Sequence, residues 1–308
     1  MIEVIKTKVT LGLLALPFVF AGCSGDENLP GGEVNDGRVA LQVSSGIQTR
    51  AFDDQWEDDD QIGIFMLNNG QNTVADGYDN VPYRVESAGA GGKAFAPSSE
   101  VIYFPTNGDK RDFIAYYPYS ADKVANGVYA IDLTNQDPQR NIDFMLAGKV
   151  TDKSRDDANV SFQFVHKLAK IVMDIQPGDG VTADDLKNIT VSLTGQPTEG
   201  TFDVLNDRNV TVTSTDKKAV TLLTDAEGTH AEGIVFPSEN YDGMSFTFAT
   251  QAIGGYEWPL NKSVEATKFE AGKKYLYTIT VNKTAIEVTA TIKDWEPGNE
   301  GGENGSAE

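Results

Sequence analysis

Short runs of β-branched and aromatic residues, each closed by a turn signal, most limit the folds open to this chain of 308 residues. The turns are marked by Asn-Gly, Pro-Gly and Asp-Gly pairs, as at 69–70, 177–178 and 242–243. Within the runs, residue types tend to alternate with the period of a strand that has one face against a core. Residues 182–189 are expected to form one short helical turn, with Thr182 as its cap. This pattern is typical of an all-β chain of the sandwich type.

The expected strands are 39–44, 61–67, 101–104, 112–117, 128–133, 161–164, 170–175, 188–193, 200–205, 210–213, 219–223, 233–236, 245–249, 274–281 and 286–292. The last two alternate most regularly and are joined by the turn-like residues 282–284, which predicts a closing hairpin. In the final strand four apolar residues fall at every second position and are expected to face one core: Ile286, Val288, Ala290 and Ile292.

We expect two tandem β-sandwich domains of the transthyretin-like, Greek-key type, at 38–155 and 156–296. The boundary is placed in a polar, charged stretch, 147–159. Residues 23–37 are rich in Gly and acids and are expected to form a flexible tether. The similar composition of 297–308 predicts a disordered tail.

The first 22 residues have the features of a lipoprotein signal peptide. Two lysines precede a largely apolar run at 9–20, which is too short to span a bilayer comfortably. It ends in Phe-Ala-Gly directly before Cys23, the one cysteine in the chain. This resembles a bacterial lipobox and implies diacylation of Cys23 and an outer-membrane anchor. An ordinary secretory signal that ends near a free cysteine is the alternative.

The chain is acidic, with 46 acidic and 25 basic residues and a formal net charge of −21. Such a field repels nucleic acid, which we exclude as a partner. Because the acids are spread along the chain, they are interpreted as a solubility feature. The densest acidic run, 53–60, lacks the glycine that a calcium loop needs for its tight turn, so we expect a solvated turn and no metal site.

Catalytic motifs are lacking, and no cofactor is expected. The sequence has no G-x-S-x-G, no H-E-x-x-H and no phosphate-binding loop. His166 lies in an apolar strand-like run and is expected to have a structural role. A glycosidase would need two carboxyl groups facing each other across a cleft, and nothing in the sequence marks such a pair. We therefore expect a protein that is not an enzyme.

Four stretches, in order along the chain, resemble the fimbrillin-like family of Bacteroidales, the subunits of type V pili. These are TRAFDDQWEDDDQIGIFML, VIYFPTNGDKRDFIAYYPYS, DFMLAGKV followed by VSFQFVHKLAKIVMDI, and YTITVNKTAIEVTATIKDW. The acidic CSGDE after the lipobox resembles the export signal of Bacteroidota surface lipoproteins. The resemblance implies a surface or fimbrium location and other fimbrial subunits as partners.

In that family, assembly is implied to proceed by strand exchange. A protease cuts after an arginine near the first strand, the strand leaves, and its groove accepts a terminal strand of another subunit. The matching residues are Arg50 as the cut, with Arg38 as the alternative, and Val39, Leu41 and Val43 on the strand that leaves. The alternative is that Arg50 is an ordinary loop arginine and the protein stays anchored.

The C-terminal residues bear on the position of the subunit in a pilus. The tail cannot be donated, since it lacks alternating apolar residues, and 285–295 is expected to be needed for the closing hairpin. This favours a tip or accessory subunit, or an adhesin, over a stalk subunit. The rival from another class is a surface glycan-binding lipoprotein, in which Tyr256 and Trp258 would stack on sugars of host or bacterial surfaces. Packing of these two side chains in the core or against a turn is favoured over such a contact.

Overall fold

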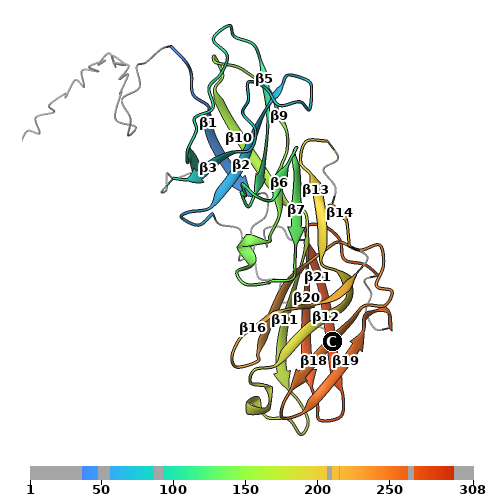
Figure 1. Cartoon of the computed structure of the whole chain (residues 1–308). Coiled ribbons are helices and arrows are strands. Elements are labelled where there is room, and N and C mark those ends of the chain that lie inside the picture. Colours follow the sequence, from blue (N-terminus) through green and yellow to red (C-terminus); the bar gives the residue numbers. More distant parts are fainter. Residues whose placement is uncertain are drawn as a thin grey trace, which may run out of the picture. The chain divides into compact units, whose positions relative to one another are not determined.

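The computed structural model describes residues 37–47, 56–86, 93–206, 210–214, 216–262 and 267–294, all within one compact unit, Gly37–Glu308 (Figure 1). Strands dominate, and the helices of the described residues are three short 3-10 turns. These are η1 (Gln139–Asn141), η2 (Ala183–Leu186) and η3 (Leu260–Lys262). The all-β prediction is confirmed. No helix in the described part of the chain has the length and apolar character needed to cross a membrane.

Seven strands of the first half close into a barrel-like ring. In order around the ring they are β2 (Gln61–Asn68), β3 (Val81–Val85), β4 (Lys93–Pro97), β1 (Gln42–Ile47), β10 (Asn159–His166), β8 (Met145–Ala147) and β5 (Arg111–Tyr117). β5 pairs back with β2, and β9 (Val150–Lys153) lies against β5 next to β8. The sandwich predicted for this half is wrong, because one sheet bends round to enclose its own core.

The second half has two sheets that share one core. One contains β16 (Leu223–Thr224), β17 (His230–Val235), β11 (Ala169–Pro177), β20 (Lys273–Val281) and β21 (Ile286–Asp294). The other contains β15 (Lys217–Thr221), β12 (Thr190–Pro197), β18 (Ser245–Thr250) and β19 (Gly254–Pro259). Ile171 and Tyr277 from the first sheet meet Val191 and Phe246 from the second in a single cluster of buried side chains.

A further sheet combines strands from both halves: β6 (Val124–Ala125), β7 (Val128–Asp132), β13 (Glu199–Asp203) and β14 (Val210–Val212). Across it, Tyr129 pairs with Phe202, and both rings contact Phe144 with centroids 4.8 Å apart. A common core therefore joins residues that the sequence analysis assigned to separate domains.

The chain passes from ring to sandwich between His166 and Ala169, because β10 pairs with β1 and β8 whereas β11 pairs with β17 and β20. This lies later than the expected boundary at 155/156. The stretch 147–159, in which the boundary was expected, contains β9, which pairs with β5.

One short helical turn matches the expected elements, and four short segments differ from them. Thr182 caps η2 as predicted, and its backbone N–H and hydroxyl donate to Asp185 at 2.8 and 2.7 Å. Residues 101–104 are not a strand, although Tyr103 forms an isolated bridge with Ala40. The sequence analysis missed several short strands, among them β3, β4 and β19, which carry prolines or adjacent glycines that are uncommon inside strands.

Candidate functional site: the first strand and its seat

Strand β1 is held on both sides by the ring. It runs parallel to β10, with Val43 opposite Val160, and antiparallel to β4, with Val43 opposite Phe95 (Figure 1). The residues just before it are held as well, because the Leu41 N–H donates to Ile102 O and the Phe104 N–H donates to Val39 O, both at 2.9 Å. Backbone hydrogen bonds therefore extend along most of 39–47.

One face of this strand points into the ring. Leu41 and Val43 are buried, Val39 is half-buried, and all three pack in the core of the ring. Gln42 and Ser44 alternate with them and are exposed. Full burial of a Val or Leu side chain contributes about 1.5–3 kcal/mol, so the apolar residues of β1 hold the strand together with its backbone bonds. These are the residues that the sequence analysis assigned to the exchangeable strand.

Trp56, the first described residue after β1, fills the ring beneath the strand. Its indole makes edge-on contacts with Phe95 of β4, Tyr117 of β5 and Phe164 of β10, each with ring centroids 5.2 Å apart. Two of these partners sit on the strands that flank β1, where Phe95 pairs with Val43 and Phe164 pairs with Ile47. We call the groove that holds β1 its seat; it is lined by the aromatic side chains of Trp56, Phe95, Tyr117 and Phe164.

Within the described residues, strand β1 is the single link between β4 and β10 in the ring. All other pairings around the ring, from β4 through β3, β2, β5 and β8 to β10, are made without it. Removal of β1 would turn the closed ring into a six-stranded sheet with two unpaired edges. Such edges present rows of free N–H and C=O groups and accept a further strand.

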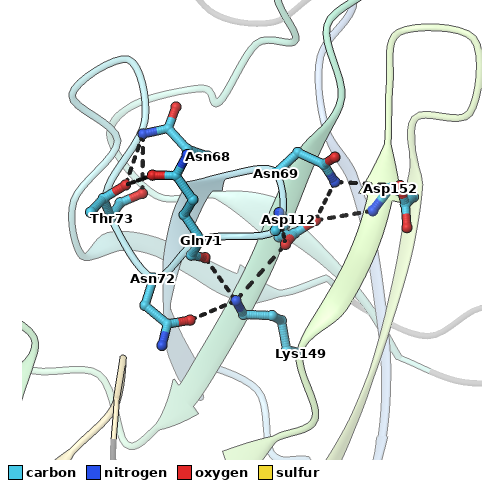
Figure 2. A network of polar contacts seen from close by, with 9 residues as sticks. Asn68, Asn69, Gln71, Asn72, Thr73, Asp112, Lys149 and Asp152 are labelled. Carbon is cyan, nitrogen blue, oxygen red and sulfur yellow. Dashed lines mark hydrogen bonds and ion pairs between the residues drawn. The ribbon is translucent and has the colours of Figure 1, made fainter.

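A buried carboxylate ties the opposite part of the ring together (Figure 2). Asp112 of β5 accepts hydrogen bonds from Asn69 Nδ2 and the Gly70 N–H at 2.9 Å, and from the Asp152 N–H at 3.1 Å. Lys149 Nζ lies 3.8 Å from the same carboxylate and donates to Gln71 O. No residue of this network belongs to β1, so the network does not depend on the first strand.

Of the two candidate cleavage arginines, Arg38 lies within the described residues. Arg38 is exposed, but its guanidinium lies 4.1 Å from the Tyr103 ring centroid, and its neighbours Val39 and Ala40 pair with 103–104. Arg155 also donates to the carbonyl of Gly37 at 3.4 Å. A protease needs a locally unpaired segment, so Arg38 is a poor substrate site. Arg50 and Cys23 lie outside the described residues.

Among the strands that the structure describes, β21 is the last; it lies at the edge of its sheet and pairs only with β20. Ile286 and Val288 are partly buried against the sandwich core. Ala290 is exposed, and 44% of the Ile292 surface is accessible. The prediction that all four alternating apolar residues face a core is therefore wrong for the second half of the strand.

Tyr256 and Trp258 do not form an exposed aromatic platform. Both lie on β19 with their side chains toward the sandwich core, where Trp258 is 6% exposed and stacks on Phe246 at 5.6 Å between centroids. Tyr256 packs partly against the core, and its hydroxyl donates to Lys283 O at 2.8 Å. The favoured expectation of core packing is confirmed for Trp258, and the glycan contact of the rival function is contradicted for it, since a sugar ring cannot reach this side chain.

The polar groups in the described residues have structural environments. His166 is buried, and its Nδ1 lies 2.8 Å from Asp143 Oδ1, which agrees with the structural role expected for it. Glu57 and Asp60 form a turn, in which Asp60 accepts from the Glu57 N–H at 2.8 Å and from the Tyr117 hydroxyl at 2.9 Å. Within the described ranges, no three His, Cys, Asp or Glu side chains are grouped so that they could hold a metal ion.

Comparison with known proteins identifies the family. The model of the fimbrillin-like family matches residues 49–295, which is most of the chain. This chain belongs to the fimbrillin-like family. It is 41% identical to Fim1C of Bacteroides uniformis, a protein named as a candidate fimbrium subunit, over 98% of this chain and 100% of the relative.

Solved structures of related proteins support the fold of this fimbrillin-like chain. A crystal structure of a candidate cell adhesion protein from B. uniformis is 39% identical, covers 85% of this chain and 100% of its own, and superposes with a TM-score of 0.75. A candidate cell adhesion protein from Bacteroides ovatus is 24% identical, covers 84% of this chain and 98% of its own, and has a TM-score of 0.64. The second likeness shows the fold alone. The family consists of fimbrial and adhesion proteins, which indicates a cell-surface protein.

Proposed function

We propose that this chain is a lipid-anchored fimbrial subunit that assembles after proteolytic removal of its first strand. The observation that carries the proposal is the position of β1, which alone links β4 to β10 and fills the ring with Leu41 and Val43. Cys23 would carry the lipid at the outer membrane, and a cut after Arg50 would separate the lipid and β1 from the rest of the chain.

The geometry favours Arg50 over Arg38 as the cut. A cut after Arg38 would leave Val39–Ile47 in place, still paired with β4 and β10 and with 102–104. A cut after Arg50 falls between β1 and Trp56, whose ring contacts would keep the new N-terminal segment attached to the ring.

The terminal strand that enters the empty groove must be both apolar on alternate positions and free to move. β21 meets both conditions in part, because it is an edge strand and leaves Ala290 and Ile292 exposed. A tip or accessory position was favoured because β21 was expected to be needed in the fold of its own subunit. The second half of β21 packs weakly, which makes that reason weaker. A subunit that also donates β21 to a neighbour is therefore the alternative to a tip or accessory subunit.

Limited trypsin digestion tests the proposal. Residues 24–308 are purified without lipid, digested, and analysed by N-terminal sequencing and by light scattering after gel filtration. We expect a new N-terminus at Ala51, followed by oligomers. Arg50→Gln should abolish both, whereas Arg38→Gln should leave both unchanged. The proposal fails if Ala51 never appears and the digested protein stays monomeric.

A further inference from the structure

The buried face of β1 contains one polar residue. Ser45 follows Leu41 and Val43 at the same spacing, is 3% exposed, and lies opposite Phe162 of β10. Its hydroxyl has no hydrogen-bond partner among the residues that the structure describes. Ser44, the preceding residue of the strand, points the other way and is exposed.

An unpaired hydroxyl in an apolar site opposes burial of the strand that carries it. In water the hydroxyl is fully hydrogen-bonded, and it loses those bonds when β1 docks without gaining replacements. Alanine has nearly the same volume and carries no such penalty. Ser45 therefore weakens the hold of the ring on β1. Its site is apolar on the β10 side, where Phe162 is fully buried, and is bordered on the β4 side by the half-buried Lys93.

We infer that Ser45 is a built-in weak point of β1, which allows the strand to leave once the chain behind it is cut. The inference rests on the proposed strand exchange and adds the direction in which the exchange runs. A strand with a small apolar residue at this position displaces β1, because it makes the same backbone bonds and buries no unpaired hydroxyl.

The chain itself contains such a strand. From Leu41, directly before β1, the alternating residues are Leu41, Val43, Ser45 and Ile47, and those of β21 are Ile286, Val288, Ala290 and Ile292. The two series match in size at every position when both strands run in the same direction, and Ala290 takes the place of Ser45. Within the proposed strand exchange, β21 of a second copy of this chain would therefore enter in the register that sets Ala290 opposite Phe162.

Two serine variants test the weak point. Ser45→Ala should raise the urea midpoint of unfolding, while the matched control Ser44→Ala should leave it unchanged. Release of the strand is measured on unlipidated residues 23–308 with a label on Cys23. The protein also carries Arg38→Gln, so that trypsin cannot cut there and the label stays on the fragment that ends at Arg50. After trypsin cleavage, we expect the labelled fragment to leave the Ser45→Ala protein about tenfold more slowly, as one unsatisfied buried group implies.

A peptide with the sequence of residues 285–294 tests the register. It should bind the trypsin-cut protein after the labelled fragment has left. An Ala290→Ser peptide should bind about tenfold more weakly. A Thr289→Ser peptide, changed on the opposite face, should bind like the parent.

The outcomes separate the inference from the proposed function. If the labelled fragment leaves the Ser45→Ala and Ser44→Ala proteins at the same rate, the weak point is overturned although exchange stands. If the Ala290→Ser peptide binds as well as the parent, the register is overturned. If the labelled fragment never leaves any cut protein, the proposed function fails. In that case the urea midpoints still test the weak point, which is rejected if the Ser45→Ala and Ser44→Ala proteins unfold at the same urea concentration.

Discussion

The indole ring of Trp56 stands edge-on to the phenyl ring of Phe164, with 5.2 Å between the centroids and 81° between the planes. This contact joins the chain behind the first strand to β10, the strand with which β1 pairs in parallel. Because Trp56 also touches Phe95 of β4, one side chain bridges both walls of the β1 seat.

We predict that Trp56→Ala costs about 3–5 kcal/mol of unfolding free energy, the range for deleting a large buried aromatic side chain. Urea unfolding followed by circular dichroism measures the loss. Trp56→Phe, which keeps an aromatic ring in the seat, should cost clearly less. A loss below about 1 kcal/mol for the alanine variant would show that the ring does not depend on this contact.

Asp112→Asn should destabilise the protein by about 3 kcal/mol, because the amide replaces one acceptor oxygen with a donor and leaves the charge of Lys149 uncompensated. Hydrogen exchange should also speed up at the Gly70 N–H, which donates to this carboxylate. Asp152→Asn is the control, since that side chain is 60% exposed and should matter by less than about 0.5 kcal/mol. Equal effects of the two changes would contradict a special role for the buried carboxylate.

Part of the unfolding free energy depends on pH through the ionisation of Asp225. Partial desolvation acts to raise its pKa, but hydrogen bonds from the Thr229 hydroxyl and N–H and from the His230 N–H outweigh it, and the pKa lies below its ordinary value of 3.8. Since the folded pKa is the lower one, the stabilisation is present above pH 3.8 and is lost as the pH falls through the folded pKa.

Asp225→Ala should therefore cost about 1 kcal/mol at pH 7, a figure that allows for solvent screening of this mostly exposed group. The difference from the wild-type protein should shrink as urea unfolding is repeated at successively lower pH below 3.8. Glu227→Ala in the same turn, with a side chain 70% exposed, should change little at any pH. A constant difference between wild type and Asp225→Ala at all pH values would argue against this carboxylate as the source.

Ile292→Ala should leave the stability of the isolated subunit within about 0.5 kcal/mol, because 44% of the Ile292 surface is accessible. The same change should reduce oligomer formation after trypsin digestion, if β21 enters the seat of another copy. Ile279→Ala in β20 is the comparison, since that side chain is fully buried and should cost about 2–5 kcal/mol. Unchanged oligomerisation of the Ile292→Ala protein would exclude this end of β21 from the interface.

Much of the local structure follows from sequence periodicity. β2, β5, β7, β11 and β20 lie within one or two residues of the expected runs, because each alternates or carries β-branched and aromatic residues between clear turn signals. The capped turn at Thr182 was predicted from the cap and the acids of its first turn. The missed strand β19 shows the converse, since Gly254, Gly255 and Pro259 are tolerated on an edge strand that has one free side.

The sequence by itself determined that the chain is all-β, which residues share a face within each strand, and where the candidate exchange strand lies. Only the tertiary structure decided that β1 closes a ring, that β7 pairs with β13 across the two halves, that Trp258 is buried and that Ile292 is not. The physical reason is that alternation reports the period of a strand but not its neighbour. Which strands pair, and which faces are covered, depends on contacts between residues far apart in the chain, such as Val43 with Val160.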